Sequence, residues 1–335
     1  MKKHIILYSL ILLIMLITPV IAVRPKNKGG AMSFDMPKRS VAVSSTVNRV
    51  DNKAVFIMLD ESTGKIIKTS DRDFVYGAVI TEMPPTFSPE ALKAQAVASY
   101  TFFCKKRREQ RAKPQKELKG ADFVVNTKDW HYYVSKQQMQ ERWGKNFEKN
   151  YSKLTRAVDS VYGEVLENDG ELILAAYHAI SGGKTEKSRD VFGGDLSYLT
   201  SVPSPGDLFA PNYCTKSEFS KEKIKGIILS KSPSAKIEDN PEKWLGAIKR
   251  TPSGMVKTIT LGGVEFKGLE LRKYLGLRSA DFDVTYKDGH FEVTVRGYGH
   301  GVGMSQYGAE YMAKQGSDYK QILSWYYPNT DVIKY

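Results

Sequence analysis

The feature that most limits what this chain can become is an uncharged, apolar segment close to its N-terminus. Lys2 and Lys3 precede the segment, and Ile5 to Val23 carries no charged side chain. A helix of this length is about long enough to cross a bilayer. We therefore expect residues 1–23 to form a transmembrane anchor. A cleaved signal segment is the alternative, because small residues such as Ala22 stand where a cleavage site would need them.

The remainder of the chain divides into a tether and a folded part. Residues 24–53 are rich in Lys, Gly, Ser and Pro and have little periodicity, which is typical of a flexible tether. The chain has 41% hydrophobic and 11% aromatic residues, which favours a globular protein. Residues 54–335 are expected to form one large domain. Its helices and hairpins show no strand–helix alternation, so the predicted fold class is α+β.

Two helices are predicted near the start of this domain. Ser70 and Asp73 have the spacing of an N-terminal cap ahead of an apolar repeat, which predicts a helix from about Asp71. Pro84 ends this helix, because the residue before a proline is pushed out of the helical region. Ser88 and the proline after it begin the clearest helix of the chain, which ends in a basic run that suits a helix C-terminus.

The rest of the domain carries mixed patterns. Alternating apolar residues on both sides of Asp288-Gly289 predict a β-hairpin, since this dipeptide suits a tight turn. The other expected elements are a hairpin over 54–70, a helix over 146–167, a strand within 170–183 that leads into a glycine turn, mixed short helices over 218–250, and helices over 306–314 and 319–326.

Glu82 is the first candidate for catalysis. It follows Phe74 and Ala78 at intervals of four on the predicted helix, so a carboxylate falls in line with an apolar face. It also occupies the last turn, where unpaired carbonyls disfavour a negative charge. Partial burial and the helix end both raise the pKa of a carboxyl group, which a general acid working near neutral pH requires. A solvated glutamate at a helix end is the alternative interpretation.

A second candidate site is the glycine turn that follows the predicted strand. Polar side chains on such a turn suit a loop that binds sugar or takes part in catalysis, and an ordinary surface turn is the alternative. A Ser181–His178 pair would be a conceivable nucleophile and base, although no G-x-S-x-G elbow is present. The candidate residues are Tyr177, His178, Ser181, Gly182, Gly183 and Thr185.

A third candidate is the stretch "RGYGHGVGMSQYG", in which glycine takes every second position four times. The spacing does not fit a nucleotide-binding loop. Alternating glycine permits positive φ or a close approach of backbone to a ligand or to another segment, such as the Glu82 helix. His300 is then either a packed core histidine or a group presented to a ligand. Gln306 is the second polar contact expected from this stretch.

The charge of the chain favours an anionic partner. It has 50 Lys and Arg residues against 37 Asp and Glu residues, a formal net charge of +13. Nucleic acid, anionic lipid and an anionic cell wall all attract such a surface, and charge alone does not separate them.

Cysteine and histidine give no strong signal for a cofactor. The two cysteines, Cys104 and Cys214, allow one bridge or two free thiols. No metal-ligand spacing is present, so a metallohydrolase that uses His178, His300 and Cys214 has no motif behind it. The composition is compatible with a structural zinc ion, and no cofactor is expected to be required.

Three stretches of the chain carry a specific combination of motifs. They read "YGAVITEMPPTFSPEALKAQAVASYT", "AAYHAISGGKTEKSRDVFGGDLSYLTSV" and "RGYGHGVGMSQYGAEYMAKQG". Together they resemble the stage II sporulation protein D family, peptidoglycan lytic transglycosylases of spore-forming bacteria that share a domain with amidase enhancers. The matches run in order from about residue 54 to the end. Ser99-Tyr100 replaces an arginine that the family usually has, and His131 stands where a glutamine is commoner.

The resemblance implies a location and a set of partners. The enzyme would be single-pass in the cell membrane, with its domain outside the cytoplasm in the space between mother cell and forespore. There it would cut peptidoglycan glycan strands during engulfment, together with a sporulation amidase and membrane partners of the engulfment machinery. Nucleic acid is not an expected partner, because this orientation puts the basic domain on the other side of the membrane.

The resemblance also implies a chemistry. The family's catalytic glutamate lies in its E-M-P motif, which maps onto Glu82. Lytic transglycosylases close the muramic acid C6 hydroxyl onto C1 without water, so one acid that becomes a base is sufficient. The glycine-turn residues, His300 and Gln306 would bind and orient the sugars. A protein that mainly activates an N-acetylmuramoyl-L-alanine amidase is the alternative function.

Overall fold

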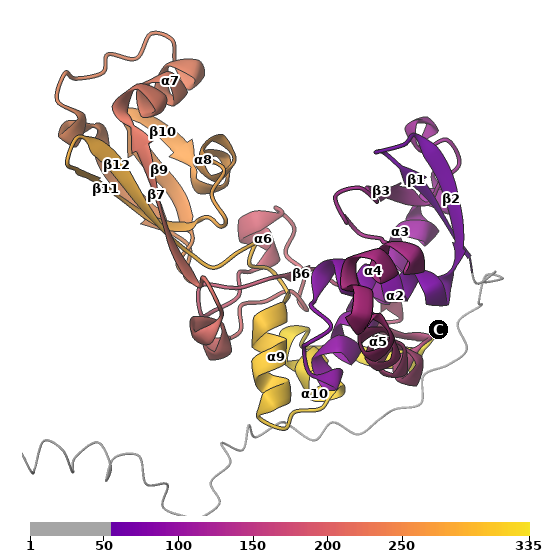
Figure 1. The fold of residues 1–335 in the computed structure, drawn as a ribbon. Helices are drawn as coiled ribbons and strands as arrows, with labels where there is room; N and C mark the ends of the chain where they lie inside the picture. Colours follow the sequence, from indigo (N-terminus) through magenta and orange to yellow (C-terminus); the bar gives the residue numbers. More distant parts are fainter. Residues whose placement is uncertain (1–54) are drawn as a thin grey trace, which may run out of the picture. The chain divides into compact units, whose positions relative to one another are not determined.

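The computed structural model of the chain describes residues 55–335 (Figure 1). The predicted anchor (1–23) and tether (24–53) lie outside these residues. Within 55–335, none of the helices combines the length and the apolar character needed to cross a membrane. Helices and mostly antiparallel sheets are mixed along the described chain, which confirms the α+β class.

The described chain opens with the predicted hairpin. β1 (Val55–Asp60) pairs antiparallel with β2 (Lys65–Ser70), and Gly64 in the turn has a φ of +70°. β3 (Phe123–Val125) adds to the other edge of β1 as a parallel strand. This small sheet places the start of the next helix, because β2 leads into it without a loop.

Helices α2 and α3 form where their caps and prolines predict them, although the Ser88 side chain makes no capping hydrogen bond to α3. α2 (Asp71–Glu82) begins at Ser70, whose hydroxyl accepts a hydrogen bond from the Asp73 N–H at 3.0 Å. α3 (Pro89–Ala112) has its proline in the first turn, where the missing N–H costs nothing. The two helices also share a buried ion pair, in which Arg107 Nη1 lies 2.9 Å from Asp71 Oδ1.

The middle of the chain differs from its prediction. The helix expected over 146–167 ends at Val161 as α5 (Phe147–Val161), and β4 (Glu164–Asn168) follows it. Gly163 between them has a φ of +82°, which ends the helix and turns the chain. β4 pairs with β5 (Glu171–Leu172) and β14 (Asp331–Lys334), so a long-range strand partner overrode the helical pattern.

The strand expected within 170–183 is also shorter than predicted. Apart from β5, only β6 (Tyr177–His178) is strand there, and it pairs in parallel with β13 (Met304–Ser305). Two further helices of this part are α4 (Lys136–Trp143) and α6 (Ser188–Val191). The short 3-10 turns of the described chain lie at Lys116–Leu118, Gly144–Asn146, Pro205–Phe209 and Pro241–Trp244.

Residues 214–296 build a second apolar core. The mixed short helices expected over 218–250 are only partly present, since strands begin and end this segment. The predicted hairpin forms at Asp288 and Gly289, both with positive φ. The elements of this core are β7 (Cys214–Ser220), α7 (Lys221–Lys231), β8 (Leu245–Arg250), β9 (Val256–Leu261), β10 (Val264–Lys267), α8 (Gly268–Leu275), β11 (Asp281–Lys287) and β12 (His290–Arg296).

The chain closes with the two predicted helices. α9 (Gln306–Lys314) has Ser305 as its N-cap, and α10 (Tyr319–Tyr326) begins with a capping box built by Asp318. Both helices contribute to the larger core, which also holds α2, α3 and α5. That core brings the end of α2, one face of α3 and the start of α9 together, and the candidate site lies there.

Candidate active site

Glu82 ends helix α2 just before the two prolines. The apolar face of α2 is buried, with Phe74 0% and Ala78 1% exposed. Glu82 lies one turn beyond Ala78 on this face, and its side chain is partly buried. No basic residue occupies the last turn of α2. The carboxyl group therefore lies at the edge of the apolar core, as its spacing predicts.

A chain of amide side chains holds the Glu82 carboxyl group in place. Gln306 Nε2 donates hydrogen bonds to Glu82 Oε2 at 3.0 Å and to Gln95 Oε1 at 3.4 Å. Gln95 Nε2 in turn donates to Ser99 Oγ at 2.9 Å. Gln95 and Ser99 are fully buried in α3, and Gln306 begins α9. Two helices that are distant in sequence thus fix one acid.

Two tyrosines lie within electrostatic range of this acid. Burial raises the pKa of Tyr177, and the nearby negative charge of Glu82 raises it further. The pKa of Tyr132 is raised by the same two causes in the same order. The Tyr177 hydroxyl is buried and forms no hydrogen bond of normal geometry within the described chain, although a contact with the Ser99 side chain opposes the rise in its pKa.

The environment of Glu82 favours its protonated form. Burial raises the pKa of the carboxyl group above its ordinary value of 4.5, and the hydrogen bond from Gln306 partly offsets this rise. The direction agrees with the sequence prediction. Among the described residues, no second carboxylate contributes to the shift. The site can therefore offer one proton and afterwards accept one.

His178 points to the opposite face of β6 from Tyr177, because successive strand residues alternate. His178 Nδ1 lies 3.1 Å from the Val302 carbonyl, and the His178 ring lies 5.7 Å from that of His300. Burial is the first cause that lowers the pKa of His178 to about 3 and that of His300 to about 4. Both rings are therefore neutral at physiological pH. His178 Nε2 is buried without a partner in the described chain.

The alternating glycines pack against the segment 176–181. A Cβ on Gly303 would lie 1.9 Å from the Ala176 carbonyl oxygen, and one on Gly299 would lie 2.8 Å from the His178 Cβ. The stretch is thus a close backbone neighbour of β6. The atoms nearest an added Cβ on Gly297, Gly299, Gly301 and Gly303 belong to other segments than α2, so the Glu82 helix is not the partner that the bare backbone admits. Gln306, near the end of the stretch, contacts Glu82 through its side chain.

Ser181 is buried and bound to an acid that the sequence did not single out. Its N–H donates to Asp207 Oδ2 at 2.9 Å, and its hydroxyl donates to the same oxygen. Ser305 Oγ donates to Asp207 Oδ1 at 2.6 Å. The conceivable Ser181–His178 pairing is wrong, because each side chain is oriented by a different partner. Asp207 instead ties the glycine turn to the start of α9.

The other residues of the glycine turn also have internal contacts. Thr185 is fully buried, and its hydroxyl accepts the Val202 N–H at 2.9 Å. Gly182 lies so close to Asp281 that an added Cβ would be 2.3 Å from its carboxylate oxygen. Gly183 is partly buried, with a φ of +101°. A direct contact between these residues and a substrate stays a prediction.

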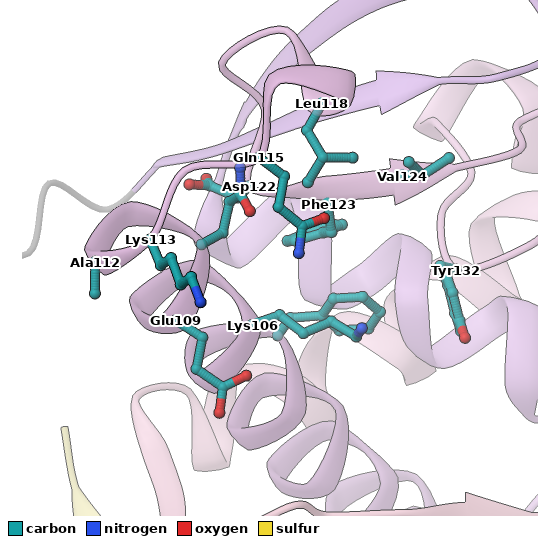
Figure 2. A pocket seen from close by; sticks show the side chains of 12 residues that line it. Lys106, Glu109, Ala112, Lys113, Gln115, Leu118, Asp122, Phe123, Val124 and Tyr132 are labelled. Atoms are coloured by element: carbon teal, nitrogen blue, oxygen red, sulfur yellow. The ribbon is translucent and has the colours of Figure 1, made fainter.

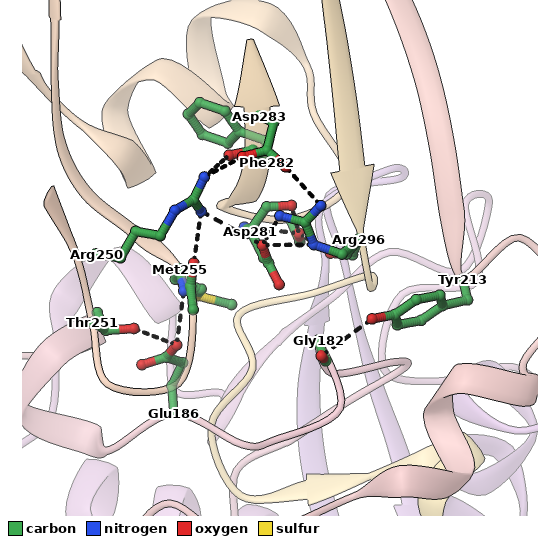
Figure 3. Close-up of polar contacts among 12 residues, drawn as sticks. Gly182, Glu186, Tyr213, Arg250, Thr251, Met255, Asp281, Phe282, Asp283 and Arg296 are labelled. Carbon is green, nitrogen blue, oxygen red and sulfur yellow. Dashed lines mark hydrogen bonds and ion pairs between the residues drawn. The ribbon is translucent and has the colours of Figure 1, made fainter. Parts of the chain in front are cut away.

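Glu186 is a buried acid just beyond this turn (Figure 3). Its Oε1 accepts hydrogen bonds from the Thr251 hydroxyl at 2.7 Å and from the Met255 N–H at 3.3 Å. Its Oε2 has no partner within the described chain, and burial raises its pKa. Glu186 therefore fastens the segment after the glycine turn to the turn between β8 and β9.

Several residues of the site were not predicted from the sequence. Gln95 could have been, because a polar residue interrupts the alanine-rich buried face of α3 formed by Ala91, Ala94 and Ala98. Tyr132 carried none, since it lies in a loop with a φ of +69°. Tyr132 also lines a cavity beside α3 (Figure 2).

Neither thiol is bridged. Cys104 is buried and Cys214 is exposed, and both are free. Residues 55–335 contain no group of three His, Cys, Asp or Glu side chains arranged to hold a metal ion. The metallohydrolase built on His178, His300 and Cys214 therefore has no geometric support in the described chain.

Fold and site together define an α+β protein with one partly buried carboxylic acid held by a glutamine amide. Residues 60–167 match the family model of the Stage II sporulation protein. The chain is 32% identical to Stage II sporulation protein D of Bacillus subtilis (strain 168), over 99% of this chain and 96% of that protein. It is also 32% identical to the Bacillus amyloliquefaciens protein of the same name, with the same coverage.

The chain therefore belongs to the stage II sporulation protein D family. It is also 27% identical to the Amidase enhancer of Bacillus subtilis (strain 168), over 77% of this chain and 40% of that protein. These relationships support a role in sporulation and at the cell wall.

Proposed function

We propose that this protein is a lytic transglycosylase that cuts peptidoglycan during sporulation. It would be held in the membrane by residues 1–23 and would act outside the cytoplasm, on glycan strands between mother cell and forespore. The observation that carries the proposal is the isolated, partly buried Glu82 carboxyl group with a raised pKa. A hydrolase usually needs a second carboxylate to activate water or to attack the sugar, whereas a transglycosylase does not.

In this mechanism Glu82 first acts as an acid. It donates its proton to the oxygen that links N-acetylmuramic acid C1 to N-acetylglucosamine, and the C1–O bond breaks. The N-acetyl group assists at the oxocarbenium stage. The Glu82 carboxylate then removes the proton from the muramic acid C6 hydroxyl, and that oxygen bonds to C1. The product is a 1,6-anhydro sugar, no water is consumed, and Glu82 ends protonated.

The groups around Glu82 suit both halves of this cycle. The Gln306 amide donates to the carboxyl group and so stabilises the ionised form that serves as base. The Tyr177 hydroxyl is buried near the acid and is proposed to help position it. The His178 ring, on the other face of β6 from Tyr177, lies 5.7 Å from the His300 ring, and the two histidines are proposed to keep that strand in place for the sugar.

Activation of an amidase is the second candidate function. The observation in its favour is the similarity to the Amidase enhancer. The two functions are compatible in one chain, since a lytic transglycosylase and the amidase that it activates can act on the same peptidoglycan.

The two functions are separated by purified protein and peptide-free glycan strands. The proposal predicts 1,6-anhydro ends from the protein alone. If the protein alone gives no anhydro ends from these strands but raises the rate at which an N-acetylmuramoyl-L-alanine amidase releases peptides from peptide-bearing peptidoglycan, then activation is the function.

A further inference from the structure

The 3-10 turn at Pro205–Phe209 presents two large apolar side chains to solvent. Leu208 is 51% exposed and Phe209 is 76% exposed, the highest value among the large apolar residues of 55–335. Single exposed apolar residues are common on protein surfaces and need no explanation. Two adjacent ones at the end of the same short turn instead suggest a contact with another molecule.

The turn itself is held firmly by its buried residues. Asp207 is fully buried and accepts hydrogen bonds from the Ser181 N–H at 2.9 Å and from Ser305 Oγ at 2.6 Å. Gly206 lies so close to α9 that an added Cβ would be 2.3 Å from the Tyr311 Cβ. The turn is therefore fastened to the glycine turn on one side and to α9 on the other. Its two apolar side chains are presented by a fixed backbone.

The ring of Phe209 lies flat against a tyrosine of α9. The centroids of the Phe209 and Tyr311 rings are 5.9 Å apart, with an angle of 12° between their planes. Tyr307 lies one turn before Tyr311 on α9, and both tyrosines are partly exposed. Their hydroxyl groups form no hydrogen bond with any described residue. Flat ring faces beside free hydroxyl groups suit a sugar, which has an apolar ring face and polar edges.

This surface is continuous with the candidate active site. Gln306, the first residue of α9, donates to Glu82 Oε2 at 3.0 Å. Tyr311 lies five residues further along, about 7–8 Å along the axis at 1.5 Å per residue. On the other side, the Leu208 Cδ2 atom is 3.5 Å from a Cβ added to Gly183, in the glycine turn that the sequence predicts to bind sugar. A linear polymer held at Glu82 is therefore expected to pass over this surface.

We propose that Tyr307, Tyr311, Phe209 and Leu208 form a distal subsite, which binds a sugar ring of the glycan strand away from the bond that Glu82 breaks. The Phe209 ring stacks on the apolar face of the sugar, and the tyrosine hydroxyls bind its polar edge. The identity of the polymer as peptidoglycan glycan rests on the proposed function. The subsite makes long strands bind more tightly than short ones.

Binding to the full chain carrying Glu82→Gln tests the subsite without turnover of the polymer. Two probes are titrated by calorimetry: a peptide-free octasaccharide of alternating N-acetylglucosamine and N-acetylmuramic acid, and the corresponding disaccharide. Phe209→Ala is expected to weaken the octasaccharide about tenfold and to leave the disaccharide unchanged. Because the Phe209 side chain is mostly exposed, its truncation leaves no cavity and the fold is retained.

Two further variants at the same position separate ring stacking from a general apolar contact. Phe209→Tyr keeps a flat ring and is expected to bind the octasaccharide as the parent protein does. Phe209→Leu keeps an apolar side chain without a flat face and is expected to lose nearly as much affinity as Phe209→Ala. Tyr274→Ala removes an exposed ring of α8 and is the control, with unchanged binding of both probes.

Three results would overturn the subsite: no binding of the octasaccharide, unchanged octasaccharide affinity in Phe209→Ala, or an equal loss for the disaccharide. Sedimentation of both proteins accompanies the titrations. If Phe209→Ala abolishes a dimer and leaves the glycan affinity unchanged, the surface is an interface between copies of the chain and the subsite is refuted. Product analysis of the wild-type protein is run in parallel. Absence of anhydro products there would refute the proposed function, while the binding result would still decide on the subsite.

Discussion

The amide of Gln306 opposes the effect of burial on the Glu82 carboxyl group. As a donor it stabilises the carboxylate and so lowers a pKa that burial raises. The sequence pointed to both residues, but their contact depends on the packing of α9 against α3. No local pattern carries that information, because the two residues are 224 positions apart.

Replacing Gln306 tests this contact. Gln306→Ala is expected to lower kcat about tenfold, because the carboxyl group loses a charge-assisted hydrogen bond that orients it. The alkaline limb of the pH profile should also move to higher pH, since the donor that lowers the Glu82 pKa is gone. Gln140→Ala, exposed on α4, is the control. A fall in kcat with an unmoved alkaline limb would argue against the contact in solution.

The wild-type pH profile has a predicted sign. Glu82 must begin protonated, and burial raises its pKa above 4.5. The value of kcat/KM should therefore be sustained above pH 4.5 and fall as pH rises through the raised pKa, because the acid form is lost. Initial rates on peptide-free glycan strands across this range provide the measurement. A rate that rises with pH over the same interval would mean that the essential group is a base.

At the scale of elements, local signals and long-range partners explain which predictions held. α2, α3 and the hairpin at Asp288 form where caps, prolines and turn residues specify them within a few positions. The helix expected over 146–167 ends earlier than predicted, at Val161, and Val165 and Leu166 are instead buried in β4. Their strand partner, β14, lies far along the chain and leaves no trace in the local pattern.

The glycines of the stretch 296–308 are explained by a segment that packs closely against them, which includes His178. Gly299 has a φ of +117°, and a Cβ there would lie 2.8 Å from the His178 Cβ. Gly299→Ala is therefore expected to lower the free energy of unfolding by roughly 1–3 kcal/mol, from backbone strain and the clash.

The measurement is a denaturant midpoint, with Gly194→Ala as control. Gly194 has neither a positive φ nor a neighbour within 4 Å of an added Cβ. Equal stability of the two variants would show that the stretch tolerates side chains and that its glycines are not required for packing.

At the scale of the whole molecule, the described chain contains two apolar cores. The hydrogen bond from Thr251 to Glu186 links a segment beside the first core to a turn of the second. Arg296 of β12 forms ion pairs within the second core, at 2.9 Å to Asp281 and 2.8 Å to Asp283 of β11 (Figure 3). The sequence predicted one domain over 54–335 and gave no sign of two cores. The joining side chains become buried only when both cores are formed, so no local pattern reveals them.

The stability of this junction should depend on pH through Glu186. Its folded pKa is raised by burial, so its contribution is fully present below the unfolded value and is lost as pH rises through the folded value. Glu186→Gln removes this loss. The free energy of unfolding of the Glu186→Gln variant should therefore increase relative to that of the wild type as pH rises, by up to about 1.4 kcal/mol per pH unit.

Urea unfolding at several pH values measures this difference. Glu222→Gln, exposed on α7, controls for the removal of one negative charge. A difference between the Glu186 variant and the wild type that stays constant with pH would show that Glu186 does not change its protonation on unfolding.

The most direct test of the account is product analysis in ¹⁸O-labelled water. Wild-type protein and Glu82→Gln are each incubated with peptide-free glycan strands, and the products are identified by mass. We predict 1,6-anhydro ends without ¹⁸O from the wild type and no cleavage by the variant. Products that contain ¹⁸O, or anhydro products from the variant, would contradict a transglycosylase that uses Glu82.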